Sequence, residues 1–116
     1  MEQGELDEAI ALTQTATQRA PEVALGWYNL GLMLRRRGDI AAALEAYSRA
    51  VELDPNNAAC HQNRAVALLL GGDIEGSRAA FRTAITLLET QGRPVDAQAL
   101  RTKAQGIVKL DLEPIA

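Results

Sequence analysis

Apolar residues recur every three or four positions along six stretches of the chain, and turns rich in Gly, Pro, Asp and Asn separate them. This spacing is typical of amphipathic α-helices, because residues three and four apart lie on one helix face. The predicted helices cover residues 4–19, 21–37, 40–53, 58–70, 74–91 and 94–108. No stretch alternates apolar and polar residues over the length of a strand, so the pattern predicts an all-α fold.

The residues at the ends of these stretches support the same boundaries. Gly38 is expected to end one helix in the left-handed conformation, which glycine adopts without a Cβ clash. Asp39 is then expected to accept a hydrogen bond from a free N–H of the next helix, and residues 71–73 repeat this Gly-Asp arrangement. Gly92 is the expected cap of the fifth helix, and Pro94 suits the first position of the sixth.

A constant period of about 34 residues runs through the chain. Gly4, Gly38 and Gly72 stand at this interval, and so do Pro21 and Pro55. When residues 24–57 are aligned with residues 58–91, nine of the aligned positions are identical. A fixed period of helix–turn–helix units indicates an array of helical repeats.

Several residues of the repeat stand at places that identify a family. In the middle unit these are Trp27, Leu30, Gly31, Gly38, Ala43, Tyr47, Ala50 and Pro55. In the following unit they are Ala65, Gly72, Phe81 and Ala84. Over residues 4 to 91 the chain resembles the tetratricopeptide repeat (TPR) family. It departs from the family pattern with Leu34 in a Tyr place, and with His61, Arg64, Ser77 and Glu89 in the Trp, Leu, Ala and Pro places of the later unit.

The resemblance implies a right-handed superhelical array of antiparallel helix pairs, a TPR-like α-solenoid. The expected single domain, residues 1–116, holds about two and a half repeats and a C-terminal capping helix. Its parts are a half repeat at 4–20 (second helix only), full repeats at 21–57 and 58–91, the capping helix at 94–108 and a tail at 109–116. The outer face of the capping helix should be solvated, and it carries Asp96, Gln98, Arg101, Thr102 and Lys103.

Small residues are expected where the two helices of a unit approach most closely. Gly31 and Ala43 occupy these places in the middle unit, and Ala65 and Ser77 occupy them in the next. Larger side chains there would force the helices apart. Tyr47, Phe81, Ala50 and Ala84 are expected to fill the space between stacked units.

The first predicted helix lacks a partner, so Leu6, Ile10 and Thr13 are expected to present an uncovered face. A single repeat cannot bury its own apolar face. Three explanations are open: the chain is an excerpt of a longer array, the face pairs with another copy, or it is a natural end. The first is favoured, and the second comes next.

Composition and charge narrow the class of protein. Alanine is the commonest residue and aromatic residues make up only 3% of the chain, which favours closely packed helices. The net charge of −3 is small and negative. It argues against a nucleic-acid partner, because binding to phosphates requires a basic surface. The N-terminus shows no secretory signal, and the longest apolar run, residues 65–70, is too short for membrane insertion. The single cysteine requires no oxidising compartment, so the expected location is cytoplasmic.

No catalytic constellation is visible in the sequence. Cys60 and His61 are neighbours, but adjacent helical residues point about 100° apart, so they are better interpreted as packing residues than as a catalytic dyad. His61 is the only histidine, so the chain offers no two-histidine metal site. Residues 71–73 lack the Lys-Ser/Thr of a phosphate loop. We therefore expect no enzyme activity, no metal and no cofactor.

The resemblance implies binding of another protein, whose peptide segment or helix would lie in a concave groove lined by the first helix of each unit. The implied groove residues are Leu25, Tyr28, Asn29, Leu32, Arg35, Arg36, Gln62, Asn63, Val66, Leu69 and Leu70. Asn29 and Asn63 share one repeat position, where an amide can bond a peptide backbone. The other interpretation of Leu32, Val66 and Leu69 is that they pack against neighbouring helices.

Two features give this binding role some chemical detail. The basic run of residues 35–37 is either a solvated helix end, favourable to the helix dipole, or a contact for an acidic peptide. Tyr28 and Leu32 replace the Lys and Asn with which one TPR subfamily clamps a terminal carboxylate, so that use is disfavoured. The expected role is therefore a scaffold or adaptor that binds apolar anchors and an acid.

The alternative role is structural. A homo-oligomer would form through the uncovered N-terminal half repeat or through the apolar tail that begins near Ile107. The same tail is also a candidate to fold back into the groove.

Overall fold

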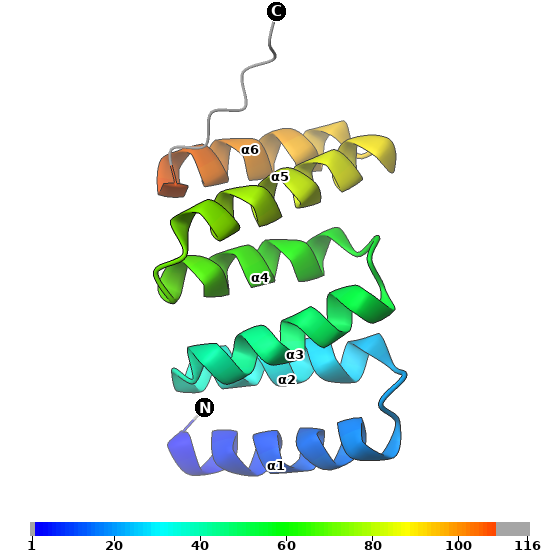
Figure 1. The fold of residues 1–116 in the computed structure, drawn as a ribbon, viewed down its shortest axis with the longest axis vertical. Coiled ribbons are helices and arrows are strands. Elements are labelled where there is room, and N and C mark those ends of the chain that lie inside the picture. Colours follow the sequence, from blue (N-terminus) through cyan, green and yellow to red (C-terminus); the bar gives the residue numbers. More distant parts are fainter. Residues whose placement is uncertain (1, 109–116) are drawn as a thin grey trace, which may run out of the picture. The chain divides into compact units, whose positions relative to one another are not determined.

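The computed structural model describes residues 2–108, which form six α-helices and no strand (Figure 1). They divide into two compact units at Asn56–Asn57. Unit 1 contains α1 (Gln3–Arg19), α2 (Ala24–Arg37) and α3 (Ile40–Leu53). Unit 2 contains α4 (Ala58–Leu70), α5 (Ile74–Thr90) and α6 (Pro94–Val108). The predictions made for the tail at 109–116 lie outside the described residues. None of the described helices is long and apolar enough to cross a membrane.

The second helix was predicted to begin at Pro21, and this was wrong. Pro21 and Glu22 lie in a turn, and α2 begins at Ala24. The carbonyl of Pro21 accepts a hydrogen bond from Trp27 Nε1 at 2.8 Å, and the N–H of Val23 donates to Ala20 O at 3.2 Å. These bonds hold the proline turn outside the helix. In the second unit, α5 ends at Thr90, just before the predicted end.

The glycines predicted to end helices do so. Gly38, Gly72 and Gly92 have φ values of 96°, 89° and 73°, in the left-handed region. After each glycine the next N–H donates back across the turn, for example from Asp39 to Leu34 O at 2.9 Å. This bond satisfies a carbonyl that would otherwise lack a partner at the helix end.

The two aspartates that follow these glycines behave differently. Asp73 Oδ1 accepts a hydrogen bond from the Gly76 N–H at 2.8 Å and so caps α5. Asp39 was predicted to cap α3 in the same way, and this was wrong, because its side chain makes no cap bond. Its Oδ2 instead accepts from Arg37 Nε at 2.7 Å. The equivalent of Arg37 in the next repeat is Gly71, which leaves Asp73 free to cap.

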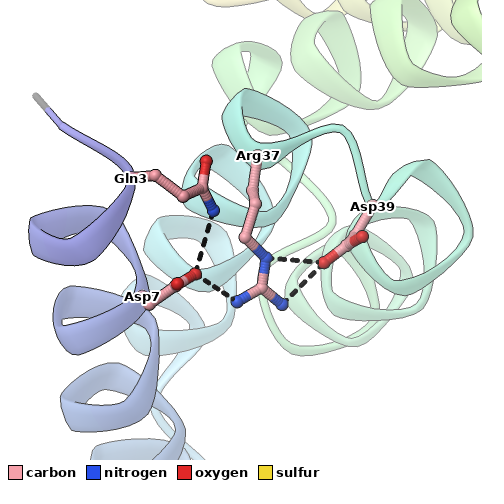
Figure 2. Close-up of polar contacts among 4 residues, drawn as sticks. All are labelled: Gln3, Asp7, Arg37 and Asp39. Atoms are coloured by element: carbon pink, nitrogen blue, oxygen red, sulfur yellow. Dashed lines mark hydrogen bonds and ion pairs between the residues drawn. The ribbon is translucent and has the colours of Figure 1, made fainter.

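Arg37 connects three parts of unit 1 (Figure 2). Its Nη1 lies 2.9 Å from Asp7 Oδ1 on α1, and its Nη2 lies 2.6 Å from Asp39 Oδ2 at the start of α3. Gln3 Nε2 donates to the same Asp7 oxygen at 3.0 Å. The hydrogen bonds with Asp7 and Asp39 raise the pKa of Arg37 above its ordinary value. The two carboxylates thus fix the N-terminal half of α1 to the turn between α2 and α3.

In unit 1, α2 packs against both α1 and α3. The prediction that Leu6 and Ile10 would be left uncovered was wrong, since they are only 4% and 2% exposed. An amphipathic helix has one apolar face, and α1 turns that face toward α2. Thr13 is half-buried, and its hydroxyl, which donates to Ala9 O at 2.8 Å, lies 3.9 Å from Met33 Sδ of α2. The uncovered side of α1 instead carries Leu12, which is 67% exposed.

The close approach predicted between α2 and α3 occurs at Gly31 and Tyr47. A Cβ atom added to Gly31 would lie 2.7 Å from two ring carbons of Tyr47, whose side chain is fully buried. In unit 2 the buried Ala65 and Ser77 occupy equivalent places. Ser77 Oγ also donates to the Ala65 carbonyl at 2.8 Å, a bond the sequence did not reveal. Small residues therefore hold both helix pairs together at close range.

In unit 2, α5 packs against both α4 and α6. Its buried residues include Phe81, Ile85 and Leu88, and α6 contributes Leu100 and Ala104. Two arginines fasten α6 at its edges. Arg78 Nε of α5 donates to Val108 O at 2.9 Å, and Arg101 Nη2 of α6 lies 3.2 Å from Glu89 Oε2.

We predict that Gly31→Ala destabilises the protein by about 1–3 kcal/mol, because the enclosed Tyr47 ring has no room to move away from the new methyl group. Gly106→Ala is the matched control. No atom lies within 4 Å of a Cβ at Gly106, so removing a helical glycine there should stabilise the protein by about 0.5–1 kcal/mol. Urea unfolding measures both changes. Equal effects of the two substitutions would contradict the close approach.

The two aspartates give a second matched pair. Asp73→Ala should cost about 1 kcal/mol, because the Gly76 N–H loses its cap. Most of this loss should persist at high salt, because salt screens the interaction of the carboxylate with the helix dipole but does not replace the lost hydrogen bond. Asp39→Ala removes no cap, only an exposed ion pair with Arg37, and its smaller effect should fade at high salt. Unfolding free energies measured at low and high salt test this. The same loss and the same salt response in both variants would show that the two aspartates do not differ in role.

Candidate functional site

A hollow of about 270 Å³ opens on unit 2, between the first turns of α4 and α6 and the last turns of α5. Buried apolar side chains form its base, and exposed alanines from α4 and α6 border it. Its apolar lining consists of Ala58, Ala59, Leu88, Ala99 and Leu100, and its polar lining consists of Gln62, Arg93, Asp96 and Lys103. An apolar base with a few polar groups at the edge is the usual make-up of a binding site in a protein.

The turn between α5 and α6 gives the hollow its shape. Gly92 adopts a left-handed conformation, and the Arg93 N–H donates to Leu88 O at 2.8 Å. Pro94 then begins α6, which returns along α5 and buries Leu100. Arg93 Nε lies 2.9 Å from Asp96 Oδ2, one turn further along the helix. This ion pair holds both side chains at the mouth of the hollow.

The residues of α6 at the hollow do not keep the 34-residue register. The helices α2 and α4 begin 34 residues apart, at Ala24 and Ala58, whereas α6 begins at Pro94, two residues later than this period requires. Leu100 and Ala104, both buried, therefore correspond to Arg64 and Leu68 of α4, which are packing positions of the repeat. The sequence analysis did not single out Arg93 or Leu100 as site residues, and it assigned Asp96 and Lys103 only to a solvated outer face. Asp96 and Lys103 are exposed, and they also line the hollow. Because α6 begins two residues later than the 34-residue period requires, extending the pattern would not have identified these residues.

Of the groove residues predicted on α4, the hollow includes Gln62. Its neighbour Asn63 is half-buried, and its Nδ2 donates to the Ala59 carbonyl at 2.8 Å. That donor is therefore used inside the helix, although it was expected to bond a peptide backbone. Val66 and Leu69 are half-buried and do not line the hollow, whereas Leu70 is exposed.

The groove residues predicted on α2 lie in unit 1. Leu25 is 63% exposed, and Tyr28, Leu32 and Arg35 are half-buried. Asn29 and Arg36 are exposed. The Tyr28 ring lies 6.2 Å from the Tyr47 ring at an interplanar angle of 56°, so Tyr28 also contributes to the packing of α2 on α3. A binding role for this face stays a prediction.

The arginines of the basic run separate into two kinds. Arg37 is engaged by Asp7 and Asp39. No ion pair involves Arg35 or Arg36 within residues 2–108. Only these two remain available as a basic edge on α2.

A second, more open depression of about 540 Å³ lies on unit 1 beside α3, and it is lined by Trp27, Leu44, Glu45, Ser48 and Arg49. The guanidinium of Arg49 lies 5.6 Å from the Trp27 ring centroid and also pairs with Glu52 at 3.1 Å. The cation on this depression is thus already engaged by two neighbours. The depression offers mainly carbon surface, although Glu45, Ser48 and Arg49 also line it.

Of the neighbouring residues Cys60 and His61, the first has a buried side chain and the second is half-buried. Across residues 2–108 no group of three or more His, Cys, Asp or Glu side chains is placed to hold a metal ion.

Comparison with known proteins matches the repeat pattern. One family model described as tetratricopeptide repeat matches residues 1–58, and another with the same description matches residues 34–105. The chain is 37% identical to a TPR repeat-containing protein of Synechococcus elongatus, over 90% of this chain and 35% of that protein. It is 33% identical to tetratricopeptide repeat protein 36 of Homo sapiens, over 79% of this chain and 46% of that protein. The chain thus spans less than half the length of either relative.

Solved structures with the same fold include the type III secretion translocator chaperone SycD of Yersinia enterocolitica. It matches with a TM-score of 0.80 and 16% identity, over 90% of this chain and 72% of that one. PcrH in complex with the chaperone binding region of PopD matches with a TM-score of 0.78 and 24% identity, over 91% of this chain and 77% of that one. The repeat period, the helix pairs and the two family models agree: the chain belongs to the tetratricopeptide repeat family.

Proposed function

We propose that this chain is a protein-interaction module that binds a segment of a partner protein, with the hollow of unit 2 as a principal contact. The observation that carries the proposal is the make-up of the hollow. Gln62, which the TPR resemblance assigns to the groove, lies beside an apolar base together with Asp96 and Lys103 of α6. Two structural neighbours support it by analogy, since one is a translocator chaperone and the other is bound to a region of PopD.

The size of the hollow favours a side chain of a partner over a free small molecule. At about 270 Å³ it falls just below the range of about 300–1,000 Å³ typical of small-molecule sites. An apolar side chain on Leu88 and Leu100 would anchor a longer segment, which continues over the exposed surface of Ala59 and Ala99. A scaffold or adaptor role would follow from such binding.

The first helix of the full repeat in unit 1, α2, offers a separate contact surface. Leu25 presents an exposed apolar side chain, and Arg35 and Arg36 supply positive charge on the same helix. We include this face in the proposal as a second contact. A cytoplasmic location and the absence of a nucleic-acid partner stay predictions from the sequence.

A photo-reactive amino acid at Ala99 tests the proposed contact. Ala99 is exposed and borders the hollow, so the probe should cross-link a partner in native lysate after illumination. The matched control places the same probe at Ala79, which is exposed on α5 and lies outside the hollow. Gel shifts and mass spectrometry compare the two. Cross-links of equal yield at both positions would move the binding surface away from the hollow.

Self-association is the second candidate function, because α1 exposes Leu12 on its uncovered side. The equivalent repeat positions in α3 and α5 are Ala46 and Ala80, which are 2% and 4% exposed. The equivalent surface is covered in both later helices and open in α1. A second copy of the chain would cover it.

If self-association occurs, the wild-type protein should show a mass that rises with concentration, and Leu12→Arg should remain a monomer. Size-exclusion chromatography with light scattering makes the measurement. Val95→Arg is the control, because Val95 is 81% exposed and lies on α6 of unit 2. A wild-type protein that stays monomeric at the highest concentration would reject this candidate.

A further inference from the structure

We propose that the hollow of unit 2 selects a partner segment in which an apolar side chain is followed closely by a carboxylate, and that Lys103 pairs with this carboxylate. The inference rests on the proposed function, and it adds the chemistry of the ligand. The partner is therefore an acidic-apolar segment of another protein.

The hollow carries one positive charge that no acidic side chain within the described residues neutralises. Arg93 and Asp96 neutralise each other across 2.9 Å. Lys103 is exposed at the edge of the hollow, and within the described residues it takes part in no ion pair. One positive charge is thus left over beside an apolar surface. A ligand carboxylate would complement it, whereas a ligand amine would be repelled.

The helices around the hollow add to this positive potential. Ala58 and Ala59 are the first two residues of α4, and Asp96 is the third residue of α6. The hollow therefore opens at two helix N-termini, where the helix dipole favours negative charge. Asp96 already satisfies part of this preference at α6, which leaves α4 and Lys103 to act on a ligand.

The base of the hollow requires an apolar group next to the acid. Leu88 and Leu100 are 6% and 4% exposed, so they offer a small carbon surface that water covers in the free protein. A leucine-sized or aromatic side chain would displace this water and gain from burial. A purely acidic segment would leave the surface uncovered, and a purely apolar one would leave Lys103 unpaired.

Gln62 supplies the remaining polar contact. Its side chain is half-buried on the hollow and makes no hydrogen bond within the described residues. The amide can donate and accept at once, as the backbone of an extended segment requires. Gln62 and Lys103 come from different helices that border the hollow, so they would hold the segment from both sides.

A random peptide library displayed on phage tests the inference, with selection on the wild-type protein, Lys103→Glu and Arg82→Glu. Arg82 is an exposed cation on α5 outside the hollow, so its variant is the matched control. Wild type and Arg82→Glu should enrich peptides with an apolar residue close to Asp or Glu. Lys103→Glu should enrich peptides in which Lys or Arg replaces the acid.

Fluorescence polarisation then measures the affinity of a selected peptide for each protein. Its affinity should fall about tenfold or more in Lys103→Glu, because one charge-assisted contact is lost and a repulsion is added. Exchanging the peptide acid for Lys should restore binding to this variant. Circular dichroism checks that each variant is folded.

Two kinds of result would overturn the inference, and they differ in whether peptide binding itself is also rejected. Enrichment of the same acidic peptides by Lys103→Glu, or of peptides without acids by the wild type, would reject the ligand chemistry and leave peptide binding intact. No enrichment by any of the three proteins would reject peptide binding itself, and with it this inference.

Discussion

The contact of Gly31 with the Tyr47 ring sets the geometry on which unit 1 depends. A Cβ atom at residue 31 would lie 2.7 Å from the ring, so the present distance between α2 and α3 requires glycine there. Ala65 and Ser77 provide the equivalent close contact in unit 2. Because the packed face of each first helix is fixed in this way, the opposite face is left for other contacts. Close packing thus decides which residues of the repeat are available for binding.

The hollow lies where the repeat leaves its regular pattern. The helix α6 begins two residues later than the 34-residue period requires, and it has no second helix of its own among the described residues. Arg93, Asp96 and Lys103 border the apolar base here, and we propose this hollow as the binding site of unit 2. The helix α6 therefore does more than cover the core. It contributes Asp96, Ala99, Leu100 and Lys103 to the lining of the hollow.

The sequence predicted most of the helix boundaries, because glycine at a left-handed position and proline at a helix start are local requirements. It could not predict contacts that depend on a second segment. Asp39 does not cap α3, because Arg37 competes for its carboxylate. Leu6 and Ile10 are covered, because α2 uses both of its sides. The hollow was missed because Arg93 and Lys103 acquire a role only when α6 packs on α5 and borders the hollow together with α4, and the family pattern ends at residue 91.

We propose that ligands bind unit 2 at the hollow. Amide chemical-shift mapping by NMR tests this proposal most directly, with a titration of the peptide that the wild-type protein enriches. We expect the largest shifts at Gln62, Ala99 and Lys103, whereas Ala79 and Arg82, which are exposed on α5 outside the hollow, should stay unchanged. Shifts concentrated on α5 around Ala79, with none at the hollow, would contradict it.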